Sequence, residues 1–212
     1  MFTADQVWGL AVAADRINGG YFKEQQWGQS DSGESKLLKE ANKAMVKHWL
    51  RTNNFTAATQ ADIDRGREIR HYFNGFLLKE LSGMINDFER QALRLAQIDE
   101  FTGRNLFEFA VISCLPSVMV REESRKDLAQ AVRNSTQLTG SVGDAIQGEI
   151  EVVRATYKAQ YGRWVIVGRL VDSYVSFYYN NNMEQGSKVY IKGKIKSIEQ
   201  DNMTRLHYVK RA

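Results

Sequence analysis

Residues 188–198 read KVYIKGKIKSI, and this stretch decides the fold because two kinds of position alternate along it. One set is basic apart from a single tyrosine, and the other is apolar or glycine. Successive side chains of a β-strand point to opposite faces, so one face is expected to pack inward and the other to meet water. The predicted outward row is Lys188, Tyr190, Lys192, Lys194 and Lys196, and the inward row is Val189, Ile191, Gly193 and Ile195.

Four further stretches around it have the composition of short strands. Together they predict strands at 149–157, 163–170, 174–179, 188–198 and 204–209. The turn residues Tyr161–Gly162, Asp172–Ser173 and Asp201–Asn202 separate neighbouring strands. Three consecutive strands, a longer connection and a final hairpin match the OB-fold barrel. The helix that usually joins the third and fourth strands is missing, so another five-stranded barrel or an open sheet stays an alternative.

The preceding part of the chain has helical periodicity. Thr3 and Gln6 have the spacing of a capping box at the start of a first helix, which Asn18, Gly19 and Gly20 end. A polar loop at 25–35 is followed by a predicted second helix at 36–50, and helical patterns also cover 59–81, 85–97, 106–115 and 122–132. Pro116, the only proline, is expected to break or kink the helix before it.

The expected fold class is therefore α+β, with a helical N-terminal region followed by a small five-stranded OB-like β-barrel. From Asn134 to Gly148 the composition changes to Asn, Ser, Thr, Gly and Asp, which is typical of a linker. The predicted domains are a helical domain at 1–135, a linker at 136–148 and the barrel at 149–212.

Charge is concentrated near the carboxyl end. The 212 residues carry a formal charge of only +4, but from Gly186 onward seven basic side chains face two acidic ones. Cys114 has no second cysteine with which to pair, and its apolar neighbours predict an inert core thiol. Residues 1–10 do not have the pattern of a secretory signal, and no apolar stretch reaches the length of a membrane span. The sequence therefore predicts a cytoplasmic protein without a membrane partner.

The basic and aromatic side chains of the predicted barrel suit single-stranded nucleic acid, because cations attract phosphates and exposed rings stack on unpaired bases. If Val175 and Phe177 are core, Tyr174 and Tyr178 are exposed and become the better stacking candidates. The alternative is a solvated edge strand, whose lysines block aggregation. The predicted nucleic-acid-binding residues are Lys188, Tyr190, Lys192, Lys194, Lys196, Arg205, Lys210, Tyr174 and Tyr178.

Signals for enzymatic chemistry are weak. The three histidines are far apart, none is near the cysteine, and no phosphate-binding or nucleophile motif is present. We predict no catalytic residue, no cofactor and no metal site. Asp62 and Asp64 form a carboxylate pair of the kind that a metal-dependent nuclease needs, but an i, i+2 pair on a helix points apart. Capping or surface charge is the plainer interpretation of this pair.

Three segments resemble parts of uncharacterised phage-encoded replication and recombination accessory proteins. The main one is GSKVYIKGKIKSIEQDNMTRLHYVK, residues 186–210, which is similar to the terminal strands of their OB-like single-stranded-DNA-binding modules. DIDRGREIRHYFNGF, residues 62–76, and VISCLPS, residues 111–117, are similar to their helical region.

The resemblance implies a phage accessory factor in the bacterial cytoplasm that binds single-stranded DNA, in preference to RNA, without sequence specificity. The helical domain is expected to dock a replication protein or a second copy of the chain. The alternative function is a protein-interaction module that recruits or inhibits a replication or host enzyme, with the barrel as its scaffold.

Overall fold

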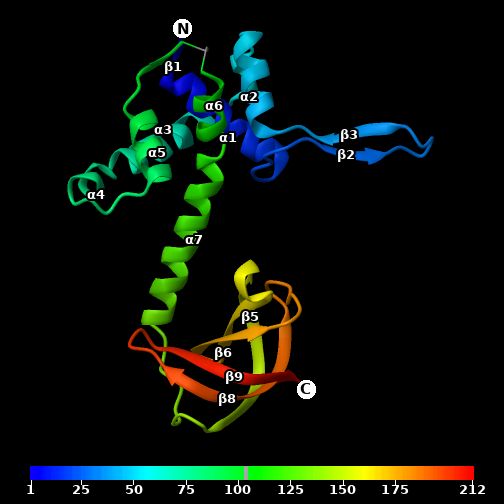
Figure 1. Ribbon diagram of the computed structural model, residues 1–212, viewed down its shortest axis with the longest axis vertical. Coiled ribbons are helices and arrows are strands. Elements are labelled where there is room, and N and C mark those ends of the chain that lie inside the picture. Colours follow the sequence, from blue (N-terminus) through cyan, green and yellow to red (C-terminus); the bar gives the residue numbers. More distant parts are fainter. Residues whose placement is uncertain (103–104) are drawn as a thin grey trace. The chain divides into compact units, whose positions relative to one another are not determined.

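The computed structural model describes residues 1–102 and 105–212. The chain divides into two compact units, Met1–Glu123 and Ser124–Ala212, and the boundary falls within helix α7 (Leu115–Arg133) (Figure 1). A helical unit thus precedes a closed five-stranded barrel, which confirms the predicted fold class. Within the described residues, no helix is both long and apolar enough to cross a lipid bilayer.

Helix α1 (Ala4–Asn18) forms the centre of the helical unit. Its N-terminus has the predicted capping box between Thr3 and Gln6, and Gly19 ends it in the left-handed conformation with φ 68°. Most of its side chains are buried, among them Val7, Trp8 and Leu10. The remaining elements of this unit are β1 (Phe2–Thr3), β2 (Gln26–Gln29), β3 (Ser35–Lys39), α2 (Asn42–Arg51), η1 (Phe55–Ala57), α3 (Gln60–Asn74), α4 (Leu77–Leu81), α5 (Asp87–Ala96), β4 (Glu100–Phe101) and α6 (Leu106–Ile112).

The prediction of a helix at 36–50 is wrong for its first residues, 36–41. Residues 26–39 instead form an antiparallel hairpin, β2–β3, in which Trp27 pairs with Leu37, and α2 begins only at Asn42. The buried side chains of Asn18 and Asn42 hold the base of this hairpin, since the Asn18 amide donates to Asn42 Oδ1 at 2.8 Å and to the carbonyl of Glu40 at 2.9 Å. Leu37 and Leu38, assigned by the prediction to the apolar face of a helix, are exposed.

The helical segment before the single proline ends close to it, as predicted. Helix α6 ends at Ile112, and α7 begins at Leu115, so that Pro116 lies in the first turn of α7. A proline is tolerated there because the first N–H groups of a helix have no partner within the helix. The segment predicted as a separate helix at 122–132 is the continuation of α7.

The barrel has strand order β5-β6-β7-β9-β8, with β8 returning to β5. Its strands are β5 (Ala145–Lys158), β6 (Arg163–Leu170), β7 (Ser173–Tyr179), β8 (Lys188–Ile198) and β9 (Met203–Arg211), and a short 3-10 turn, η2 (Ala159–Tyr161), follows β5. All pairings are antiparallel except that between β7 and β9. This closed arrangement is OB-like, and it removes the open-sheet alternative.

The alternation on β8 is the predicted one. Val189, Ile191 and Ile195 are buried, whereas the lysines and Tyr190 between them are exposed. Met183, from the connection between β7 and β8, joins this core in the segment where an OB-fold usually has its helix. Strand β5 begins at Ala145, so residues 145–148 of the predicted linker lie in the barrel.

Val171 is a strained residue at the two-residue turn between β6 and β7, with φ 56° and its side chain 80% exposed. A β-branched side chain disfavours this left-handed conformation, which asparagine adopts readily. We expect Val171→Asn to stabilise the barrel by about 1 kcal/mol, measured by urea unfolding of the full chain. The matched control is Val142→Asn, at an exposed position without positive φ, which should change stability by less than about 0.5 kcal/mol. Equal stabilities for the two variants would contradict the expectation.

Candidate nucleic-acid interface

A groove of about 930 Å³ lies on the outer face of the barrel. Strands β6 and β7 and the β8–β9 hairpin, including its turn at Glu199–Asp201, supply all of its lining except Lys158 of β5. Lys158, at the end of β5, lies at the edge of the first turn of the barrel. In OB-folds, this same face with these same two turns binds oligonucleotides or oligosaccharides.

Four cations and two carboxylates line the groove. The cations are Lys158, Arg163, Lys196 and Arg205, and the carboxylates are Glu199 and Asp201. Arg205 is not free, because its Nε lies 3.1 Å from Glu199 Oε1. Asp201 accepts a hydrogen bond from the backbone N–H of Met203 and so shapes the turn. The groove therefore has a net positive charge to which Lys158, Arg163 and Lys196 contribute most directly.

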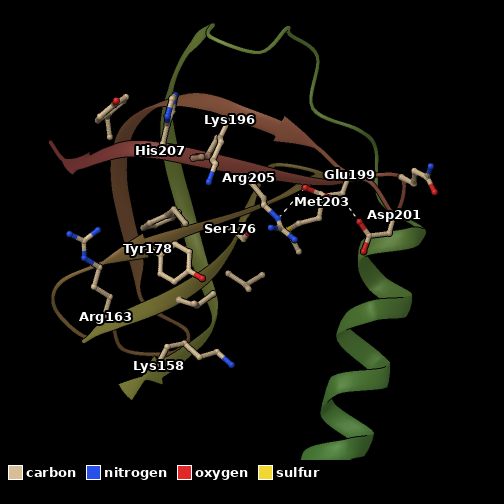
Figure 2. A pocket seen from close by; sticks show the side chains of 16 residues that line it. Lys158, Arg163, Ser176, Tyr178, Lys196, Glu199, Asp201, Met203, Arg205 and His207 are labelled. Atoms are coloured by element: carbon tan, nitrogen blue, oxygen red, sulfur yellow. Dashed lines mark hydrogen bonds and ion pairs between the residues drawn. The ribbon is translucent and has the colours of Figure 1, made fainter. Parts of the chain in front are cut away.

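Tyr178 supplies a flat apolar surface among these cations. In the view of Figure 2 its ring lies between Lys158 and Arg163 on one side and Lys196 and Arg205 on the other. The ring is 50% exposed, and Tyr161 meets it edge to face with ring centroids 5.6 Å apart. Such an edge contact helps to orient the ring, and its half-exposed surface is available for stacking.

A β-bulge brings a second ring to the groove. Lys192 pairs with Lys210 and Lys194 with His207, so that Gly193 alone is opposite both Tyr208 and Val209. The extra residue, Tyr208, has φ 53° and is exposed, and Val209 packs against the core instead. Gly193 permits this approach, because a Cβ there would lie 3.0 Å from Val209 Cγ2. The bulge thus turns outward a tyrosine that regular alternation would have turned inward.

The structure brings together three of the nine residues predicted from the sequence. Tyr178, Lys196 and Arg205 line the groove. The other six are not in its lining: Lys188, Tyr190, Lys192, Lys194, Lys210 and Tyr174. Lys188 lies 3.6 Å from Glu149 on β5, Tyr190 pairs across the strands with the same Glu149, and Lys192 pairs with Lys210. Tyr174 is half-buried and pairs with Arg169 on β6.

The lining residues that were not predicted include two cations, Lys158 and Arg163, and two rings, those of Tyr208 and His207. A signal for the first two was present, because they flank the first turn of a predicted OB-like barrel, where such barrels bind their ligands. The outward position of Tyr208 depends on the bulge, which strict alternation does not predict.

Asp62 and Asp64, the carboxylate pair considered for a nuclease, lie in different environments and have different partners. The Asp62 carboxylate is buried, receives hydrogen bonds from Arg16 at 2.9 and 2.8 Å, and caps α3 through Thr59. Asp64 is exposed and pairs with Arg67. Over residues 1–102 and 105–212, no group of three or more His, Cys, Asp or Glu side chains is placed to hold a metal ion.

The barrel and its groove together define an OB-like module with a positively charged, ring-bearing face. Comparisons with models of protein families, with curated proteins and with solved structures found no match to this chain.

Proposed function

We propose that the barrel binds single-stranded nucleic acid, DNA in preference to RNA, without sequence specificity and without catalysing a reaction. The observation that carries the proposal is the groove that is lined by the exposed rings of Tyr178 and Tyr208 together with four cations. Unpaired bases stack on such rings, and the cations release counterions from the phosphates. The resemblance of residues 186–210 to phage accessory proteins supports a role in phage DNA replication or recombination, in the bacterial cytoplasm.

The experiment is titration of a fluorescein-labelled oligothymidylate, and of a duplex of equal length, at low and moderate salt. We expect the single strand to bind more tightly than the duplex, since the rings need unpaired bases, and its affinity to fall as salt rises. An absence of binding at low salt would overturn the proposal.

The salt dependence also tests where the strand binds. Each phosphate contact of a single strand contributes about 0.7 to the slope of log affinity against log salt. We expect the double variant Arg163→Ala/Lys196→Ala to reduce this slope by about 1.4 if each side chain contacts one phosphate. The matched control is Lys188→Ala/Lys192→Ala. It removes two exposed cations of β8 that are not in the groove lining, so it should leave the slope unchanged. If the control reduces the slope more than Arg163→Ala/Lys196→Ala does, the strand binds the outer face of β8 and not the groove.

A second candidate function, protein interaction through the helical unit, is favoured by one observation. Leu78, Leu81 and Met84, in and just after α4, are strongly exposed, and exposed apolar clusters often mark protein contacts.

A further inference from the structure

Helix α2 in the helical unit has a basic face. Lys43, Lys47 and Arg51 are spaced four residues apart, so they lie along one side of the helix, and α2 contains no acidic residue. Lys43 lies in the first turn, where the helix dipole disfavours a cation and where no side chain caps the helix. Glu24 lies 3.5 Å from Lys43, and the described part of the chain gives Lys47 no ion pair. This face therefore has positive potential that the helical unit only partly neutralises.

An apolar pit opens between the two lysines and helix α6. Its volume is about 420 Å³, and it is lined by Lys43, Ala44 and Lys47 from α2 and by Phe107, Phe109 and Ala110 from α6. Phe109 is buried and forms the inner wall, whereas Phe107 is 59% exposed. The small side chains of Ala44 and Ala110 leave the space that the pit occupies. The lysines contribute their apolar stems to the walls and can place their ammonium groups at the rim.

We propose that this pit, which we call the α2–α6 pit, docks an acidic peptide segment of a partner protein that inserts one aromatic or large aliphatic side chain. The inserted side chain would pack against Phe107 and Phe109, and flanking carboxylates would pair with Lys43 and Lys47. The proposal rests on charge complementarity to the acid-free α2 and on the adjoining apolar cavity. It concerns a different surface from the barrel groove and does not depend on nucleic-acid binding there.

A nucleobase fits the same pit less well. The polar groups of the lining side chains are those of Lys43 and Lys47, and ammonium groups only donate hydrogen bonds. The donor groups on the edge of a buried base would therefore have no side-chain acceptor, which carries a desolvation cost. An apolar side chain has no such requirement.

The test uses the full chain and a short fluorescein-labelled peptide of alternating aspartate and serine that ends in phenylalanine, with binding measured by anisotropy. We expect saturable binding that weakens as salt rises. Lys47→Glu and Phe107→Ala should each weaken it by at least about tenfold. A peptide with lysine in place of aspartate, and one with alanine in place of phenylalanine, should both fail to bind.

Two matched variants control for non-specific effects. Lys36→Glu makes the same charge change at an exposed position on the β2–β3 hairpin, and Phe88→Ala removes a ring that is 42% exposed on α5. Both should bind the peptide as the unmodified chain does, and so should Tyr178→Ala in the barrel. Two results would each overturn the proposal: no peptide binding, or equal losses in the variants and their controls. In the first case, an oligonucleotide whose binding depends on Phe107 would identify the pit as a nucleic-acid site instead.

Discussion

Replacing Tyr178 by alanine is expected to weaken single-stranded oligonucleotide binding by between about five- and 150-fold, which corresponds to about 1 to 3 kcal/mol. The reason is geometric: the ring lies in the groove, Tyr161 holds it edge to face, and its half-exposed surface can stack on a base. Tyr178→Phe keeps the ring and should retain most of the affinity. This pair of variants separates stacking from any hydrogen bond of the hydroxyl group.

Tyr190→Ala is the matched control for Tyr178→Ala. Tyr190 is 43% exposed on β8, close to the 50% of Tyr178, but it pairs with Glu149 outside the groove lining. We expect this variant to weaken binding by less than about threefold, a bound of under 1 kcal/mol. Anisotropy titration of labelled oligothymidylate measures both variants, and their urea unfolding curves show whether the barrel is intact. If Tyr190→Ala weakens binding more than Tyr178→Ala, the outer face of β8 is the interface and the groove is not.

The strands could be predicted because strand periodicity is a local property. The alternation at 188–198 determines which side chains of β8 enter the core, and its predicted bounds are the observed ones. The hairpin at 26–39 was mistaken for loop and helix because Leu37 and Leu38 resemble the start of an apolar helical face. The base of the hairpin is held by hydrogen bonds from Asn18 to residues more than twenty positions away in the sequence, which no local pattern reports.

The candidate site could be predicted only in part, for a related reason. Alternation predicts that a lysine points away from the core. On a closed barrel, however, outward side chains point in different directions at different places, so an outward lysine need not line the groove. Lys188 and Lys196 belong to one outward row, yet Lys188 lies near Glu149 of β5 whereas Lys196 lines the groove with residues of β6 and β7. Register and bulges decide this placement, as the outward turn of Tyr208 shows.

Replacing Asp62 by alanine is expected to destabilise the helical unit by about 2 to 3 kcal/mol. The Asp62 side chain is 4% exposed, accepts two hydrogen bonds from the Arg16 guanidinium, and takes part in the capping box of α3 by accepting from the backbone N–H and the hydroxyl of Thr59. The variant would lose these charge-assisted bonds together with the cap. Loss of helical circular dichroism during urea unfolding of the full chain measures the change.

Asp64→Ala is the matched control on the same helix. Asp64 is exposed and its partner Arg67 is also held by Asp5, so this variant should lose less than about 1 kcal/mol. If Asp62 instead belonged to a metal-dependent nuclease, the unmodified chain would cleave DNA in the presence of magnesium. Asp62→Ala would then lose this cleavage and keep nearly the stability of the unmodified chain. A loss of stability no larger than that of Asp64→Ala would contradict the structural role.

The pH dependence gives this prediction a second, independent readout. Burial alone would raise the pKa of Asp62, but the hydrogen bonds from Arg16 and Thr59 outweigh it and hold the pKa below its ordinary value. A carboxyl whose pKa is lower in the folded chain contributes stability that is fully present above the unfolded pKa of about 3.9. That contribution is lost as the pH falls through the folded-state pKa. The stability difference between the unmodified chain and Asp62→Ala should therefore be constant near neutral pH and shrink below about pH 4. A difference that grows in acid would mean that the buried carboxyl is held in its protonated form, and the ion pair with Arg16 would then not be what stabilises this end of α3.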